Sequence, residues 1–97
     1  MIIFTTPEFQ RWLKNLKDLK AKAKILVRLE RIRMYDHFGD SKSLGSGLSE
    51  LRISEGKGYR LYFTQKDREA ITFLGGGGKK TQSKDIKRCY KLIRTIT

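Results

Sequence analysis

The chain has 97 residues, with 22 Lys or Arg against 10 Asp or Glu, so its formal net charge is +12 and its pI is close to 10.1. This length predicts a single domain, residues 1–97, and excludes a nucleotide-binding domain joined to a substrate domain. Because such an excess of positive charge repels itself in a compact state, the composition predicts a polyanionic partner such as RNA or DNA.

Other global features point to the cytoplasm. No apolar run approaches the roughly 20 residues that a membrane span needs, and residues 1–9 lack the basic start and the long apolar stretch of a signal peptide. The single cysteine, Cys89, cannot form an internal disulfide. We therefore expect a cytoplasmic protein with no membrane partner.

The first half of the chain predicts a short strand followed by two helices. Residues 1–5 are apolar and β-branched, as in strands. Residues 6–8, Thr-Pro-Glu, place a hydroxyl, a proline and an acid where a helix begins. A second helix is predicted over residues 19–35, with Gly39 suited to its exit. The apolar residues at helical spacing, expected to face the core, are Phe9, Trp12, Leu13, Leu16, Ile25, Leu29 and Ile32.

The second half predicts three strands and a closing helix. Residues 40–47 are rich in Gly and Ser and are expected to form a loop. Residues 48–53, 59–64 and 70–74 have strand patterns separated by short turns. A helix over residues 82–94 would bury Cys89 in its apolar stripe, as core packing and not as a nucleophile. Short turns imply an antiparallel sheet covered by helices, an α+β fold in the order β-α-α-β-β-β-α.

Charged and aromatic residues share one side of two predicted strands. Glu50 and Arg52 lie opposite the apolar side of residues 48–53, and Arg60 and Tyr62 opposite that of residues 59–64. If the strands pair as a hairpin, all four side chains reach the same face of the sheet. Such a face can bind a phosphodiester, stack on a base and move a proton. An ordinary solvated face with salt bridges would have the same composition.

Four consecutive glycines, residues 75–78, precede Lys79 and Lys80. The run is not a Walker A loop, because that motif needs Ser or Thr after the lysine. Backbone N–H groups at the start of a helix, beside two lysines, favour a phosphate-binding site. The alternative is that the glycines only let two segments pass closely. The one histidine and one cysteine have no metal-ligand spacing, so no metal or cofactor is predicted.

Several ordered motifs carry a family resemblance. They are Phe9-x-x-Trp12-Leu13, Phe38-Gly39-Asp40-x-Lys42-x-Leu44-Gly45, Ser49-Glu50-Leu51-Arg52-Ile53, Gly58-Tyr59-Arg60-Leu61-Tyr62-Phe63 and Gly77-Gly78-Lys79-x-Thr81-Gln82-x-x-Asp85-Ile86. Together they span nearly the whole chain and resemble the addiction-module killer proteins, the phage-derived, HigB-like branch of the RelE/ParE toxin superfamily. The resemblance implies a RelE-like fold, with a helical hairpin and a C-terminal helix packed on a small antiparallel sheet.

The resemblance also implies a function. Toxins of this kind belong to type II toxin–antitoxin systems, and many RelE-like members are metal-independent endoribonucleases that cut mRNA on the ribosome. Such an mRNA interferase inhibits translation and arrests growth, and it is neutralised by a cognate antitoxin. In this branch the antitoxin often carries a helix-turn-helix domain. The partners expected from the resemblance are therefore an antitoxin, the ribosome and mRNA.

Roles of single residues follow from the matching positions. Arg60 corresponds to the arginine that RelE-like toxins use at the scissile phosphate. Arg52 and Glu50 fall where RelE has catalytic lysines, and Lys80 falls near its second catalytic arginine. The expected catalytic residues are Arg60, Arg52, Glu50, Lys80 and Asp85, and the expected RNA-binding residues are Lys42, Lys79, Lys80, Tyr62 and Lys84.

Two departures from the family pattern leave the acid–base chemistry open. Ile86 stands where RelE has a catalytic tyrosine, and Gly78 stands where this branch commonly has an acid. Glu50 and Asp85 remain the candidates for base and acid. Two other functions also remain open, a non-enzymatic gyrase inhibitor like the ParE relatives and a plain RNA- or DNA-binding module. The face rich in Arg and Lys favours RNA.

Overall fold

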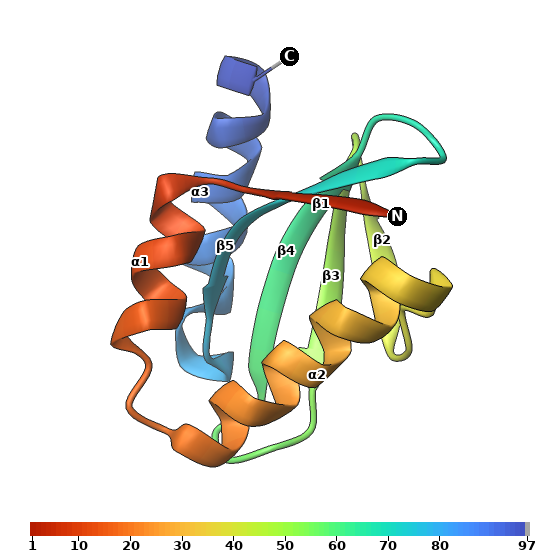
Figure 1. Cartoon of the computed structure of the whole chain (residues 1–97). Coiled ribbons are helices and arrows are strands. Elements are labelled where there is room, and N and C mark those ends of the chain that lie inside the picture. Colours follow the sequence, from red (N-terminus) through yellow and green to blue (C-terminus); the bar gives the residue numbers. More distant parts are fainter. Residues whose placement is uncertain (97) are drawn as a thin grey trace.

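The computed structural model describes residues 1–96 as a five-stranded sheet between two layers of helix (Figure 1). Helices α1 and α2 cover one face of the sheet, and α3 covers the other. No helix of the described residues is long and apolar enough to cross a membrane. In chain order the elements are β1 (Ile2–Thr5), α1 (Pro7–Asn15), α2 (Leu19–Tyr35), β2 (Ser41–Gly45), β3 (Leu48–Ile53), β4 (Tyr59–Gln65), β5 (Ala70–Gly77), the short 3₁₀ helix η1 (Lys79–Thr81) and α3 (Gln82–Ile96).

The predicted α+β fold is confirmed, but the sheet differs from the expectation in two ways. Residues 41–45, expected within a loop, form β2, which pairs with β3 and places Lys42 opposite Glu50. Strand β1 runs parallel to β5 and not antiparallel to it, with Ile3 opposite Ile71. The strand order is therefore β1-β5-β4-β3-β2. A parallel pair needs a long crossover, and here the whole chain between β1 and β5 supplies it.

Side chains at the helix ends set the boundaries that the sequence predicted. The hydroxyl of Thr6 accepts a hydrogen bond from the backbone N–H of Phe9 at 3.1 Å, which caps α1. Asp18 caps α2 in the same way. Helix α2 ends at Asp36, whose φ of 55° is in the left-handed region, so the exit residue is Asp36 and not the expected Gly39. Aspartate tolerates this conformation better than most residues.

Two apolar cores form, one on each face of the sheet. Because successive side chains on a strand point to opposite faces, Leu51 and Leu61 belong to one core while Leu48 and Tyr62 belong to the other. The sequence predicted that Leu61 and Tyr62 project from opposite sides, but it did not predict the second core. The core under α1 and α2 consists of Phe9, Ala21, Ile25, Ile32, Leu51, Ile53, Tyr59, Leu61, Phe63, Ile71 and Phe73. The core under α3 consists of Leu48, Tyr62, Leu74 and Cys89. Helix α3 therefore lies over the side of the sheet that the sequence marked as polar.

The glycine run is the end of a strand and not a loop. Gly75, Gly76 and Gly77 belong to β5 and pair with β4. A Cβ on Gly76 would lie 2.5 Å from the Trp12 ring, and a Cβ on Gly77 would overlap the carboxylate of Asp85. These glycines make room for side chains of α1 and α3, which was the alternative explanation of the run. Gly78, the last of the four, precedes η1 and has open space where its side chain would be.

Candidate nucleic-acid interface

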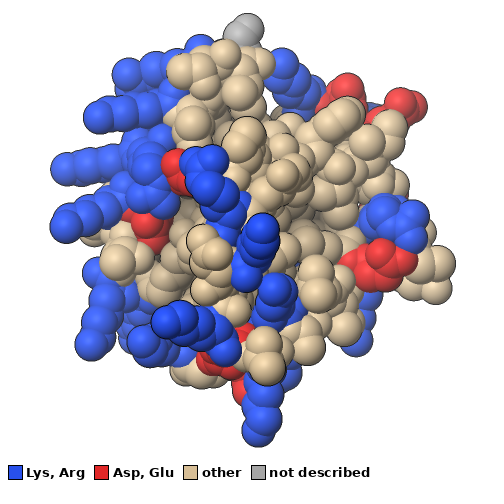
Figure 2. All heavy atoms as spheres, turned by 60° about the vertical axis from the view of Figure 1, so that its left-hand side comes forward, with Lys and Arg blue, Asp and Glu red and all other residues tan. Residues whose placement is uncertain are grey.

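Positive charge covers much of the side of the molecule formed by α1 and α3. Figure 2 turns this side forward and shows Lys and Arg side chains gathered on its left half and lower part, with few carboxylates between them. The exposed cations on these two helices are Arg11, Lys14, Lys84, Lys87, Lys91 and Arg94. The expected RNA-binding residue Lys84 therefore lies on an exposed basic surface.

A buried carboxylate lies at the centre of the sequence-predicted site. Glu50 on β3 is fully buried, and its oxygens are approached by three cations. The Nε of Arg60 lies 2.9 Å from Oε1, the Nε of Arg52 lies 3.5 Å from Oε2, and the Nζ of Lys42 lies 4.0 Å from Oε2. The side-chain amide of Gln82, the first residue of α3, donates a hydrogen bond to Oε1 at 2.7 Å. We refer to these five residues as the Glu50 cluster.

The sheet register brings the Glu50 cluster together. Lys42 pairs with Glu50, and Arg52 pairs with Arg60, on adjacent antiparallel strands. Two like charges directly opposite each other destabilise a strand pair, and the carboxylate of Glu50 offsets this repulsion. Three cations against one carboxylate leave a formal charge of +2 on the cluster. The cluster therefore has positive charge to offer to a second anion.

The two arginines differ in their freedom. The side chain of Arg60 is only 12% exposed, and its Nη1 donates a hydrogen bond to the carbonyl oxygen of Gly58 at 3.0 Å. With Nε beside Glu50, Nη2 is the nitrogen outside both contacts. The side chain of Arg52 is 41% exposed. Arg52, Arg60 and Lys79 border one pocket of about 270 Å³, so a largely buried and a partly exposed guanidinium border the same small space.

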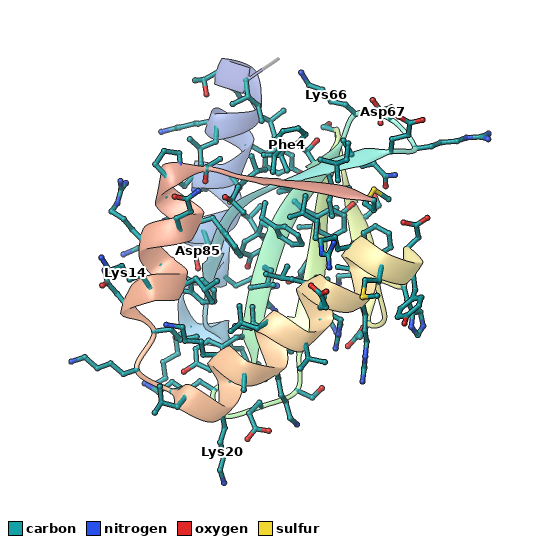
Figure 3. All side chains as sticks on the ribbon, in the orientation of Figure 1. Phe4, Lys14, Lys20, Lys66, Asp67 and Asp85 are labelled. Atoms are coloured by element: carbon teal, nitrogen blue, oxygen red, sulfur yellow. The ribbon has the colours of Figure 1, made fainter. Side chains whose placement is uncertain are left out.

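Asp85 lies on the buried side of α3, away from this pocket. Figure 3 shows it between α1 and α3. Its carboxylate accepts hydrogen bonds from the Thr81 hydroxyl at 2.6 Å and from Nη2 of Arg88 at 3.0 Å. The Nε of Arg88 also donates to Glu8 at 2.7 Å, and this hydrogen bond raises the pKa of Arg88. Asp85 and Arg88 thus connect η1, α1 and α3.

Burial contradicts three of the roles expected from the sequence. Tyr62 is fully buried beneath α3, so its ring cannot stack on an RNA base. Burial raises the pKa of Tyr62, with further contributions from Glu50 and Asp85, and its hydroxyl has no hydrogen-bond partner among the described residues. Glu50 and Asp85 are 0% and 4% exposed. Neither carboxylate reaches an RNA bound at the surface, so neither is placed to act as its general base or acid.

The lysines expected to bind RNA lie at two places. Lys42 belongs to the Glu50 cluster. Lys79 and Lys80 are exposed in η1 and line a second pocket of about 740 Å³ with Lys57 and Tyr59. Gln82 and the Gly58 carbonyl were not identified from the sequence, because their roles arise from contacts between separate elements and leave no local signal.

The described residues include neither a metal-binding group of side chains nor an accessible thiol. Among residues 1–96, no three His, Cys, Asp or Glu side chains are placed to hold a metal ion together. Cys89 is fully buried in the core under α3. Burial raises the pKa of its thiol to about 12. At neutral pH the side chain is therefore a protonated, apolar core group, as the sequence predicted.

Solved structures that match this architecture include an isolated RelE toxin and chains of RelB–RelE complexes. A chain of the RelB–RelE antitoxin–toxin complex of Methanococcus jannaschii matches with a TM-score of 0.67 and 14% identity, covering 84% of this chain and 95% of that one. A chain of the intact E. coli RelBE complex matches with a TM-score of 0.63 and 11% identity, over 79% and 94% of the two chains. The isolated E. coli RelE toxin matches with a TM-score of 0.62 and 13% identity, over 90% and 96%. The fold is therefore RelE-like.

Sequence similarity defines the family more narrowly. Residues 11–95 match the model of the family described as phage derived protein Gp49-like (DUF891), and the chain belongs to this family. It is also 46% identical over 94 residues to an uncharacterized protein of Haemophilus influenzae, covering 97% of this chain and 94% of that protein. The family description and the RelE-like fold agree with the phage-derived, RelE-like resemblance that the motifs indicated.

Proposed function

We propose that this protein is the toxin of a type II toxin–antitoxin pair and that it cleaves mRNA at the ribosome as a metal-independent endoribonuclease. The observation that carries the proposal is the pairing of Arg52 with Arg60 across β3 and β4, beside a buried carboxylate and facing one pocket. The RelE-like fold and the net charge of +12 support it. This function places the protein in the cytoplasm.

The chemistry needs charge stabilisation more than a reactive side chain. In RNA cleavage the 2′-hydroxyl gives its proton to water or hydroxide and attacks the adjacent phosphorus, and the bond from phosphorus to the 5′-oxygen breaks. The products are a 2′,3′-cyclic phosphate and a 5′-hydroxyl, and negative charge grows on the phosphate oxygens in between. Preorganised cations at that point stabilise the transition state more than the substrate. The guanidinium of Arg60 is held by Glu50 and the Gly58 carbonyl, and that of Arg52 is partly exposed at the same pocket. The ammonium group of Lys79 borders the same pocket and can donate a proton to the leaving oxygen.

Glu50 acts in this proposal as a positioning residue. It touches Arg60, Arg52 and Lys42 and not the RNA. Its negative charge allows Arg52 and Arg60 to lie opposite each other on β3 and β4. Its contact with Nε of Arg60 orients the guanidinium of that residue. Because the cluster keeps a formal charge of +2, the carboxylate does not cancel its attraction for a phosphate.

The partner in this proposal is a cognate antitoxin, a small helix-turn-helix protein with an acidic segment. The net charge of +12 favours an acidic partner, which would associate fastest at low salt. Helix α2 also exposes a row of large apolar side chains, each at least half accessible. They are Leu19, Leu26, Val27, Met34 and Tyr35. A partner helix can bury such side chains. Co-expression with the neighbouring gene product and purification of a stoichiometric complex would test this.

The test of the activity is to map mRNA 5′ ends after brief induction in growing cells. Wild type should create new 5′ ends within translated regions and arrest growth. Arg52→Ala should lose both effects, whereas Arg68→Ala, an equal charge change in the exposed β4–β5 turn, should keep both. Growth arrest without new 5′ ends would contradict the ribonuclease and would instead favour a gyrase inhibitor.

A further inference from the structure

We propose that a groove beside the Arg52–Arg60 pocket binds the nucleotides that flank the cleaved phosphate, so that the substrate is a single-stranded RNA segment several nucleotides long. This inference rests on the proposed function. The groove lies where the α1–α2 connection, the β3–β4 turn and the light-blue η1 segment come together at the lower end of the molecule in Figure 1. We refer to it as the flanking groove.

Three pockets run together through shared residues. The Arg52–Arg60 pocket shares Tyr59 and Lys79 with the pocket of about 740 Å³. That pocket in turn shares Tyr59 and Lys57 with one of about 630 Å³, which Trp12 and residues of the α1–α2 connection border. A nucleic-acid strand with its phosphate between the two arginines could therefore continue past Lys79 and Lys57 without leaving a concave surface.

The flanking groove has an aromatic floor and a basic rim. Tyr59 and Trp12 meet edge to face, with ring centroids 6.2 Å apart. Tyr59 belongs to the core and is only 8% exposed, so the half-buried ring of Trp12 is the one that offers surface to a base. Lys17, Lys57, Lys79 and Lys80 are exposed around them. Unstacked bases gain most from aromatic and apolar surface, and phosphates gain from ammonium groups. In a duplex the bases are stacked on each other and cannot contact an aromatic side chain of the groove. The combination of aromatic and basic residues therefore favours a single strand.

Contacts around the β3–β4 turn hold Lys57 in place at the middle of the groove. Glu55 forms an ion pair with Lys24 of α2 at 2.9 Å, and its carbonyl oxygen accepts from the N–H of Gly58 at 3.1 Å. Gly56 packs so closely on Asp18 that a Cβ there would overlap its carboxylate. The turn is thus packed against the start of α2, and the position of the Lys57 backbone is set before any ligand arrives.

Two carboxylates also border these pockets, Asp18 and Asp40. The carboxylate of Asp18 already has partners within the protein. It accepts the capping hydrogen bond from the backbone N–H of Ala21 at 3.1 Å and lies 3.5 Å from the Tyr59 hydroxyl. Burial, and then the charge of Asp18, raise the pKa of Tyr59, so its hydroxyl stays neutral. The cations that line the three pockets outnumber the two carboxylates. They are Lys17, Lys57, Lys79, Lys80, Arg52 and Arg60.

The experiment measures binding of a fluorescein-labelled 2′-O-methyl hexauridylate, which cannot be cleaved, to the full chain over a range of salt. The test variant is Lys17→Ala/Lys57→Ala. The matched control is Lys66→Ala/Arg68→Ala, which removes the same charge from the exposed β4–β5 turn, outside these pockets. Figure 3 shows that the β4–β5 turn, marked by Lys66 and Asp67, lies at the opposite end of the molecule from Lys20, near the start of α2.

The test variant should bind the hexamer more weakly, and its slope of log K against log salt should fall by about 1.4, since each phosphate contact on a single strand contributes about 0.7. The control should keep the wild-type slope. A 2′-O-methyl diuridylate, too short to reach the groove, should bind the test variant and wild type equally. A duplex of the same length should bind wild type more weakly than the single strand.

Three results would overturn the inference. The first is hexamer binding by the test variant that equals that of wild type. The second is an equal loss of hexamer affinity in the test variant and the control. The third is a duplex that wild type binds as tightly as the single strand. Loss of antitoxin binding by the test variant with hexamer binding intact would assign the groove to the antitoxin instead. The binding results and the cleavage results test different claims. If wild type cleaves mRNA but the test variant binds the hexamer as tightly as wild type, only the proposed groove is refuted and the proposed function stands.

Discussion

Arg60 and Glu50 face each other diagonally across β4 and β3, with Nε of Arg60 2.9 Å from Oε1 of Glu50 and both side chains largely removed from solvent. The sequence had placed Arg60 on the side of its strand opposite the apolar residues. In the structure Arg60 helps to stabilise the buried carboxylate of Glu50. Loss of stability and loss of activity are therefore linked at this residue.

Arg60→Ala should lower the free energy of unfolding by about 1–3 kcal/mol, because Glu50 keeps its buried charge but loses its nearest cation. Adding Glu50→Gln should recover part of this loss, since the charge itself is then gone. Urea unfolding of wild type, both single variants and the double variant measures the effect. Equal stability of wild type and Arg60→Ala would show that the ion pair contributes nothing.

Arg52→Ala should separate activity from stability. Its side chain is 41% exposed and only 3.5 Å from Glu50 at its closest nitrogen, so its loss should cost less than about 1 kcal/mol. Loss of one preorganised donor should still slow mRNA cleavage about 100- to 1000-fold. Arg52→Lys should recover part of the rate, because lysine keeps the charge and loses the forked geometry. The readouts are cleavage in a translation extract and a thermal melt, and a folded Arg52→Ala at wild-type rate would refute the assignment.

Neighbouring glycines should differ sharply when each is replaced by alanine. Gly77→Ala should destabilise the protein by about 1–3 kcal/mol, since the added Cβ overlaps the Asp85 carboxylate. Gly78→Ala should change stability by less than about 0.5 kcal/mol, because its φ of −94° suits any residue and no atom lies within 4 Å of the added Cβ. Thermal melts of the two variants give the comparison. Equal melting temperatures would contradict the packing account of the glycine run.

Alkaline pH should destabilise the protein partly through Cys89. The pKa of its thiol is raised from 9.0 to about 12, so between these values the unfolded chain has lost the proton and the folded chain retains it. The free energy of unfolding must then fall as pH rises through this window. Cys89→Ala removes the contribution, and its stability should decline less between about pH 8 and about pH 10.5 than that of wild type. Urea unfolding at both pH values measures this, and parallel declines would show that burial does not hold the thiol protonated.

Much of the fold could be predicted from local physical signals. The Thr-Pro-Glu start at residues 6–8 and the apolar period placed α1 and α2, and α2 has the predicted bounds, Leu19–Tyr35. The period of two along β3 and β4 put Arg52 and Arg60 on the same face, which the sheet register confirms. These signals are readable because each depends on residues a few positions apart.

Other features depended on partners that are distant in the sequence. Residues 41–45 have no strand-like apolar pattern, and they become β2 because β3 supplies backbone hydrogen-bond partners at the edge of the sheet. Gly75–Gly77 disfavour a strand by themselves, yet β5 continues through them because Trp12 and Asp85 occupy the space that side chains would need.

At the candidate site, too, some features follow from the local sequence and others depend on distant parts of the chain. The sequence by itself determined the excess of positive charge and the side of each strand from which Glu50, Arg52, Arg60 and Tyr62 project. Only the tertiary structure decided that α3 lies over that side, which buries Glu50 and Tyr62, fixes Arg60 and leaves Arg52 half exposed. The physical reason is that the repeat of apolar residues along a strand or helix determines which way its side chains point. Whether those side chains are buried depends on the element that packs against them.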